Sequence, residues 1–84
     1  MNYPGIVDVT LRHGIADPEG ATIERALPAL GFTGVTNMRA GKSYRMDIDA
    51  DSESAALEKA AALAQRLLSN PVIENASARS GAKG

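Results

Sequence analysis

Two segments of the chain alternate strictly between apolar and polar residues, which is typical of strands with one buried face. They are residues 6–12, with Val7, Val9 and Leu11 on one face, and residues 43–49, with Tyr44, Met46 and Ile48 on one face. Residues 35–40 and 72–75 are more weakly patterned, and we expect two further strands there. Gly41 permits a tight turn at 40–42, which predicts a hairpin between 35–40 and 43–49.

Apolar residues at helical spacing mark a helix that begins near residue 17. Asp17 is a suitable N-terminal cap and Pro18 fits the first helical position. Pro28 predicts a kinked or 3₁₀ last turn, and Gly31 is the expected C-terminal cap. The apolar face consists of Ile23, Ala26, Leu27 and Leu30.

A second helix is expected from about residue 52 to residue 69. Asp51 and Ser52 can cap its start, and Asn70-Pro71 stops it. Its predicted apolar face consists of Leu57, Ala60, Ala61, Ala64, Leu67 and Leu68.

The order β-α-β-β-α-β predicts an α+β fold, a two-layer ferredoxin-like sandwich with two helices on one face of an antiparallel sheet. We expect a single domain over 1–76 and a flexible polar tail over 77–84. The uncovered sheet face would be partly apolar, through Ile6, Thr10, Thr36 and Met38. That face or the sheet edges could therefore pair with another chain.

Composition removes several classes of function. The 84 residues include no cysteine and one histidine, and the net charge is −1. Disulfides and thiolate zinc sites are excluded, and no basic surface is available for nucleic acid. With no long apolar run and no signal peptide, we expect a cytoplasmic protein that binds neither membrane nor nucleic acid. So small a domain has a modest core, which favours a homo-oligomer.

Catalytic chemistry finds no support in the sequence. His13 is the single histidine, and no serine is placed beside it by a recognisable motif. Asp47, Asp49 and Asp51 share a spacing that could face a cation, but they are too few for a calcium loop. A phosphatase of this fold would need an arginine within the loop at 13–17, and Arg12 only precedes that loop. We expect no catalytic residue, no cofactor and no metal.

Four short motifs along the chain are more distinctive than its composition. They are Asp17-Pro18-Glu19-Gly20, Leu30-Gly31-Phe32, Met38-Arg39-Ala40-Gly41-Lys42, and the run from Leu67 to Glu74. Their order and separations resemble the PurS family, the small subunit of phosphoribosylformylglycinamidine synthase. The resemblance covers roughly Val7 to Asn75.

This resemblance implies a role in purine biosynthesis. The chain would be a non-catalytic assembly subunit that bridges a glutaminase subunit and a large ATP-dependent synthetase subunit. It would show no activity alone, and it would belong to a glutamine-dependent C–N ligase complex. The implied partners are these two subunits and further copies of the chain, as a dimer or tetramer.

Six residues are candidate subunit contacts. Arg39 and Lys42 flank a glycine at a predicted exposed turn, where folding does not require two bases. Helix capping is the favoured explanation of Asp17, Pro18 and Gly20, and the tight turn explains Gly41. An alternative function is a free-standing regulatory module that binds a small molecule at the loop after the first strand, with Gly14 and Gly20 as its glycines. The six candidates are Asp17, Pro18, Gly20, Arg39, Gly41 and Lys42.

Overall fold

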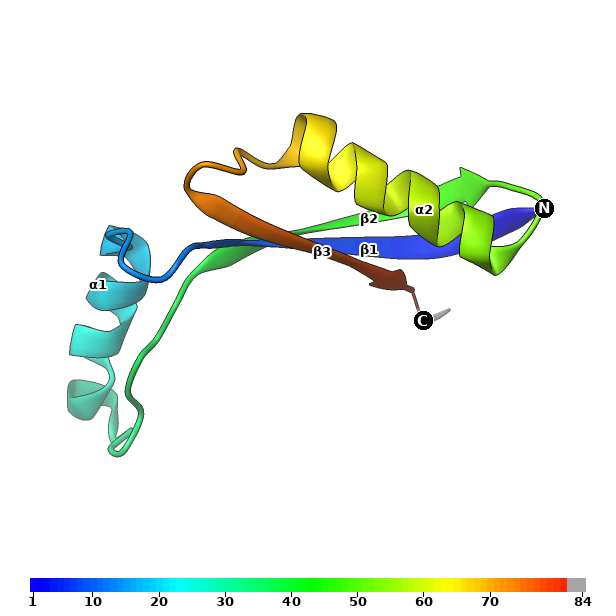
Figure 1. The fold of residues 1–84 in the computed structure, drawn as a ribbon. Helices are drawn as coiled ribbons and strands as arrows, with labels where there is room; N and C mark the ends of the chain where they lie inside the picture. Colours follow the sequence, from blue (N-terminus) through cyan, green and yellow to red (C-terminus); the bar gives the residue numbers. More distant parts are fainter. Residues whose placement is uncertain (82–84) are drawn as a thin grey trace.

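The computed structural model describes residues 1–81. They form a three-stranded antiparallel sheet with one helix across it and a second helix held away from it (Figure 1). The strands are β1 (Asn2–Leu11), β2 (Gly41–Asp49) and β3 (Glu74–Ser80), in the order β2-β1-β3, and the helices are α1 (Pro18–Ala26) and α2 (Glu53–Leu63). The predicted α+β class with an antiparallel sheet is confirmed.

The core lies between β1 and α2. Val7 and Val9 are fully buried, and Ala60 and Ala64 pack against them. Alanines at positions 56, 60 and 64 are buried at a spacing of four residues, so the helix approaches the sheet closely. The predicted face was partly wrong, because Ala61 is exposed and Leu67, in a π-helical turn over Ala64–Leu68, is 74% exposed. The buried stripe follows the small residues instead of the large ones.

The first helix has the predicted ends. The Oδ1 atom of Asp17 accepts a hydrogen bond from the Gly20 amide at 3.0 Å, and Pro18 opens the helix. A 3₁₀ turn over Pro28–Leu30 follows, and Gly31 closes it with φ of 88°. These features confirm the expectations for Pro28 and Gly31.

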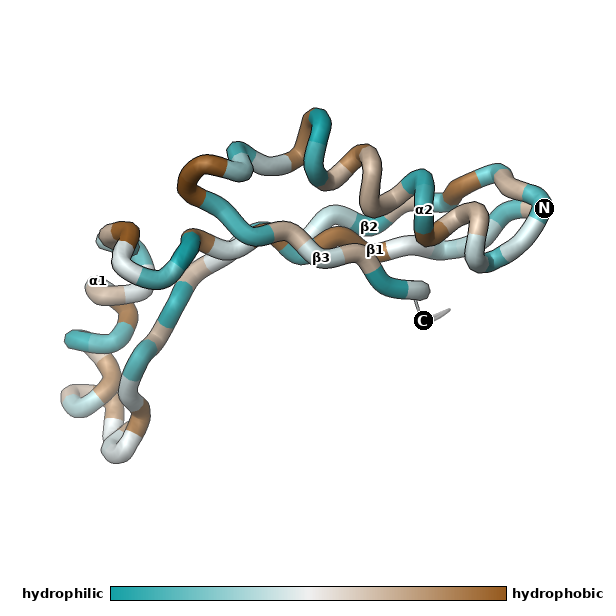
Figure 2. Tube along the Cα trace, viewed as in Figure 1, coloured by the Kyte–Doolittle hydropathy of each residue, from teal (hydrophilic) through white to brown (hydrophobic). Residues whose placement is uncertain are grey.

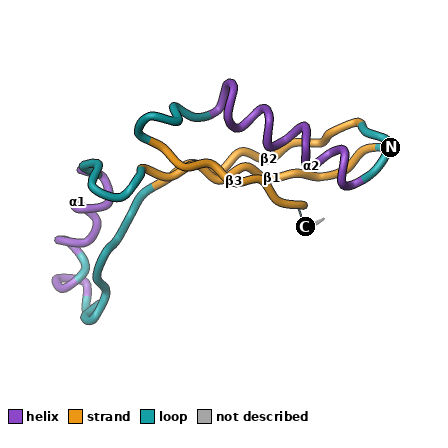
Figure 3. Tube along the Cα trace, in the orientation of Figure 1, coloured by secondary structure: helices purple, strands orange, loops and turns teal. Residues whose placement is uncertain are grey.

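The predicted strand at 35–40 and the hairpin turn at 40–42 are wrong. Asn37 has a φ of 58°, which interrupts an extended strand. The amides of Met38 and Ala40 donate to side-chain carboxylates of Glu24 and Asp17 instead of to a neighbouring strand. Residues 32–40 are accordingly loop (Figure 3), and Gly41 begins β2 opposite Thr10 of β1.

Residues 18–40 therefore form a projection, here called the arm, that consists of α1, the 3₁₀ turn and the segment leading to β2. Figure 1 shows the arm at one end of the molecule, beyond the sheet, while α2 lies along the sheet. The prediction of two helices on one face of a four-stranded sheet is wrong in this respect. The order of a ferredoxin-like domain is kept, except that the loop over residues 32–40 stands where the second strand was predicted.

The last strand begins later and runs further than predicted. Val72 and Ile73 lie in a turn, because the Asn70 carbonyl accepts from the amides of Ile73 and Glu74. β3 then pairs with β1 from Gly5 to Leu11. Residues 77–80 therefore belong to the sheet, so the predicted tail is wrong there, and residues 82–84 of that tail lie outside the described residues. The strand consists largely of alanine and serine, so it lacks the alternation of large apolar and polar residues that predicts a strand.

The sheet face opposite α2 is polar, contrary to the prediction. Of the four predicted residues only Ile6 and Thr10 lie on this face, because Thr36 and Met38 belong to the arm. Ile6 is 3% exposed and lies opposite Arg45 and Arg79 in the sheet register. Arg79 Nε donates to Asp8 Oδ2 at 3.0 Å on the same face. This face of the sheet therefore presents mainly charged side chains and little apolar area.

Within residues 1–81, no helix has the length and apolar character that a membrane crossing requires.

Candidate subunit-contact site

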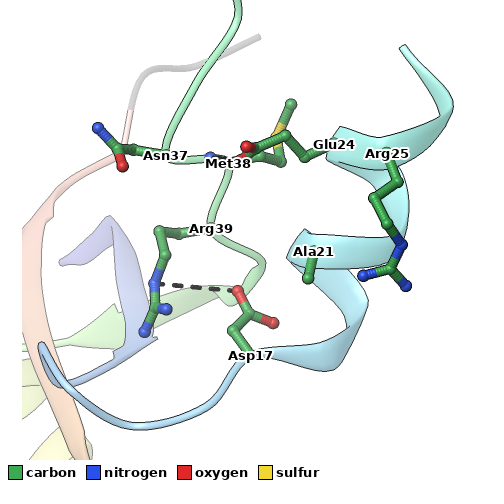
Figure 4. A pocket seen from close by; sticks show the side chains of 7 residues that line it. All are labelled: Asp17, Ala21, Glu24, Arg25, Asn37, Met38 and Arg39. Atoms are coloured by element: carbon green, nitrogen blue, oxygen red, sulfur yellow. Dashed lines mark hydrogen bonds and ion pairs between the residues drawn. The ribbon is translucent and has the colours of Figure 1, made fainter. Parts of the chain in front are cut away.

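Most of the predicted contact residues meet where the arm joins the sheet. We call this region the junction: the loop 12–17 that leaves β1 and the segment 38–42 that enters β2. Two predicted residues, Gly20 at the start of α1 and Arg39, both contact the Asp17 carboxylate there. Figure 4 shows Asp17 and Arg39 directed toward each other across the junction. The other three are Pro18, which follows Asp17, and Gly41 and Lys42 at the start of β2.

The Asp17 carboxylate ties α1 to the segment entering β2. Its Oδ1 caps the helix, and its Oδ2 accepts from the Ala40 amide at 2.7 Å. Arg39 Nε lies 4.0 Å from Oδ2, and the Asp17 side chain is only 5% exposed. The hydrogen bond from Gly20, then that from Ala40 and the charge of Arg39, hold the pKa of Asp17 below its ordinary value. The carboxylate therefore stays charged in this partly enclosed position.

Gly20 is needed for the close contact between α1 and the segment 38–40. A Cβ atom on it would lie 2.5 Å from Asp17 Oδ2 and 2.6 Å from the Met38 carbonyl oxygen. The second of these is a backbone atom, which cannot move aside without moving the arm. The glycine thus has a packing role in addition to its place in the helix start.

Arg39 makes more contacts within the chain than the sequence indicated. Its Nη2 donates to the Ile15 carbonyl at 3.1 Å and to the Arg12 carbonyl at 3.4 Å. The side chain is 41% exposed, so one part of the guanidinium still meets solvent. Arg39 therefore holds the loop after β1 and retains a surface that another chain can reach.

Gly41 and Lys42 lie on the sheet side of the junction. A Cβ atom at Gly41 would lie 2.7 Å from the Val9 carbonyl oxygen, so the close pairing with β1 explains this glycine better than a turn does. Lys42 Nζ is 3.9 Å from Glu74 Oε2, and its side chain is 60% exposed. The Glu74 side chain is 14% exposed, but the contact is long and the lysine is open to solvent, so the pair contributes little to stability, about 0–1 kcal/mol. Lys42 is thus the candidate with the least structural role.

Two residues that bond to the junction or lie in it, Glu24 of α1 and Arg12, were missed by the sequence analysis. Glu24 Oε1 accepts from the Met38 amide at 2.7 Å, and Arg12 Nε donates to the Pro71 carbonyl at 2.8 Å. The sequence pattern could have indicated Glu24, because Asp17, Gly20 and Glu24 have the spacing i, i+3, i+7 and therefore lie on one helix face. Asp17 and Glu24 of this face line a shallow cavity of about 480 Å³ against residues 37–39 (Figure 4).

The junction is built to hold the arm, and its polar groups are used for that purpose. Within residues 1–81, no cluster of three or more histidine, cysteine, aspartate or glutamate side chains could hold a metal. His13 shares a cavity with Gly14, Ile15 and Arg39. The regulatory-module alternative is not favoured, because Arg39 bonds the carbonyls of that loop and Gly20 is packed against backbone.

A small antiparallel α+β domain with a protruding helical arm is the class that the fold and the junction define. The chain belongs to the PurS family. The family model described as "PurS: Phosphoribosylformylglycinamidine (FGAM) synthase" matches residues 5–81. The predicted resemblance is confirmed.

Individual relatives agree with this assignment. The PurS subunit of phosphoribosylformylglycinamidine synthase from Archaeoglobus fulgidus is 41% identical over 68 residues, 81% of this chain and 85% of that protein. The crystal structure of the Thermotoga maritima PurS subunit superposes with a TM-score of 0.88 at 32% identity, covering 96% of this chain and 93% of that one. A chain in the structure of PurLQS from the same organism gives 0.86 at 32% identity, with coverage of 96% and 99%.

Proposed function

We propose that this chain is the non-catalytic assembly subunit of a phosphoribosylformylglycinamidine synthase complex. It bridges a glutaminase subunit and a large ATP-dependent synthetase subunit in the cytoplasm, so that ammonia released from glutamine is used for amidation. The family match over residues 5–81 carries this proposal. The similarity to a chain of the Thermotoga maritima PurLQS structure adds the context of an assembled complex.

The test is reconstitution with the two larger subunits. Amidation of the ribonucleotide substrate is measured with glutamine and, separately, with free ammonia. Omission of this chain should abolish turnover with glutamine while leaving turnover with ammonia in place. Equal glutamine-dependent turnover with and without the chain would refute the bridging role.

The exposed part of the junction is proposed to contact the larger subunits, through Arg39 and Lys42 above all. Lys42 gives the cleaner test, because its ion pair with Glu74 is long and the lysine side chain is exposed. Lys42→Ala should leave the melting temperature nearly unchanged and should lower glutamine-dependent turnover. Lys59→Ala is the control: this exposed lysine of α2 donates to the Asp49 carbonyl at 2.7 Å, so the melting temperature of this variant is measured beside its turnover. Equal turnover of the two variants would place the partner contact elsewhere.

We further propose that the chain is a homo-oligomer, a dimer or tetramer. Within residues 1–81, few apolar side chains are buried in the core. Several large apolar side chains are exposed instead, among them Leu30, Phe32, Leu67 and Val72. Light scattering at tens of micromolar should give a multiple of the chain mass. A monomer mass there would refute self-association while leaving the bridging role to be decided by the turnover assay.

A further inference from the structure

One cavity of the junction has only basic side chains among its ionisable lining residues. It has a volume of about 700 Å³ and lies between the loop that follows β1 and residues 37–39 of the arm. Its ionisable residues are His13 and Arg39, and within residues 1–81 no carboxylate lines it. A neighbouring cavity of about 220 Å³, on the sheet side of the junction, differs in that it contains Glu19 and Glu74 beside Lys42. The larger cavity is therefore suited to an anionic group.

The carboxylates nearest to this cavity are already engaged. Both oxygens of Asp17 accept hydrogen bonds from backbone amides, and Glu24 accepts from the Met38 amide. The bases of the junction are exposed, and Figure 2 shows hydrophilic positions on both segments that join the arm to the sheet. These bases are Arg12, His13, Arg39 and Lys42.

Exposed acidic side chains gather instead at the end of the molecule opposite the arm. They lie at the end of β2 and the start of α2, which Figure 1 shows far from the junction. A net charge of −1 therefore conceals a separation of charge along the molecule. The junction attracts anions while the opposite end repels them. The exposed acids of that end are Asp47, Asp49, Asp51 and Glu53.

The Arg39 guanidinium is held in place along one edge. Its Nη2 donates to the carbonyls of Arg12 and Ile15, and its Nε lies 4.0 Å from Asp17 Oδ2. The N–H groups of Nη1 have no hydrogen-bond partner in the part of the chain that the structure describes. Because the guanidinium is planar and already fixed, these donors have a set direction, and binding a carboxylate costs little further side-chain freedom.

The cavity is too open to enclose a free small molecule. Sites for small ligands bury most of the ligand surface, whereas His13, Gly14, Ala16 and Asn37 of this lining are all exposed. A side chain that projects from another protein needs no such enclosure, because its own subunit covers the rest of it. The open shape therefore favours a protein carboxylate over a free anion.

We propose that this cavity receives an aspartate or glutamate side chain of a larger subunit, with the carboxylate bound between Nη1 of Arg39 and the imidazole of His13. This inference rests on the proposed bridging function and specifies the chemistry of one contact. Hydrogen bonds from a guanidinium to a carboxylate are among the stronger ones in proteins. Opposite charges on the two surfaces also speed the encounter and fix its orientation.

Zero-length cross-linking identifies the partner group. His13→Lys keeps a cation beside the cavity and supplies an amine, which a water-soluble carbodiimide joins to a carboxylate in direct contact. In the reconstituted complex, the expected product joins this chain to a larger subunit, and mass spectrometry should place the link at an aspartate or glutamate of that subunit. Ser54→Lys, at an exposed position near the start of α2, is the control and should give little of this product. Equal yields from the two variants would overturn the proposal.

Charge reversal measures the energetic part of the contact. His13→Glu should weaken binding to the larger subunits by about tenfold or more, because two carboxylates would then meet at the cavity. Ser54→Glu adds the same charge at the opposite end of the molecule and should bind like the parent. Circular dichroism and thermal melts establish that both variants are folded.

The remaining outcomes separate this contact from the bridging function. If His13→Glu binds like the parent in a complex that still needs this chain for glutamine-dependent turnover, the carboxylate contact is refuted and bridging stands. Links from His13→Lys to a second copy of the chain alone would overturn the proposal in favour of an interface between copies. Calorimetric titration of the isolated chain with inorganic phosphate and with acetate should show no tight binding. Tight binding there, lost in His13→Glu, would assign the cavity to a free anion instead.

Discussion

Asp17 is the residue on which the position of the arm depends most, because each of its carboxylate oxygens serves a different segment. Its lowered pKa means that its contribution to stability is present above 3.8, the ordinary pKa of an aspartate, and is lost as the pH falls through the lower pKa of the folded chain. We therefore expect the melting temperature of the parent to change little from pH 7 to 5 and to fall below about pH 4.

The Asp17→Asn variant has one side-chain oxygen where Asp17 has two, so an NH₂ group replaces one of the two acceptors, and the side chain does not titrate. Its melting temperature at pH 7 should be lower by about 4 °C, and its decline in acid should be shallower than that of the parent. Asp8 also has a lowered pKa, owing first to its hydrogen bond with Arg79, so Asp8→Asn is the control. Hydrogen exchange of the Ala40 amide should quicken in Asp17→Asn alone. Unchanged exchange there would contradict the role assigned to Asp17.

Replacing Gly20 with alanine tests the close contact of α1 with residues 38–40, because the contact determines whether the variant is less or more stable than the parent. An alanine at an unobstructed helix position would stabilise the chain by about 0.5–1 kcal/mol relative to glycine. At Gly20 the new Cβ atom would meet the Met38 carbonyl oxygen at 2.6 Å. We expect Gly20→Ala to destabilise the chain by about 1–3 kcal/mol in urea unfolding. A stabilised variant would mean that α1 and the segment 38–40 are not in close contact.

Among the secondary-structure elements, those with strong periodicity or clear caps could be predicted and the others could not. β1 and β2 follow from alternation over most of their length, and the start of α1 follows from Asp17 and Pro18. β3 consists largely of small residues, so no pattern distinguished it from a tail. The candidate contacts were found through short motifs, but their structural roles depend on partners distant in sequence, such as Arg39 with Ile15.

The segment 35–40 shows why local pattern fails where side chains replace a neighbouring strand. Asn37 adopts φ of 58°, which asparagine tolerates and a β-branched residue does not. We expect Asn37→Val to destabilise the chain by about 1–2 kcal/mol, whereas Asn37→Gly should be nearly neutral. Urea unfolding of both variants measures the difference. Equal stability would mean that the segment can become a regular strand, as the sequence pattern suggested.

At the scale of the whole molecule, stability should depend on association more than in most domains of this length. The core within residues 1–81 is small, and the protruding arm exposes Leu30 and Phe32, which the proposed self-association would bury. If folded oligomers unfold to separate chains, mass action couples the melting temperature to protein concentration. For a dimer of 84-residue chains, each tenfold dilution should lower the melting temperature by about 4 °C.

Scanning calorimetry over a hundredfold range of concentration measures this dependence. Leu30→Asp and Phe32→Asp should weaken it, because a charge on the arm disfavours burial in a second chain while costing little at a position that is exposed in the single chain. Thr33→Asp, at an exposed position of the same arm, is the control and should keep the parental dependence. A melting temperature independent of concentration in the parent would show that the single chain is stable with its arm uncovered, and the arm would then need a different explanation.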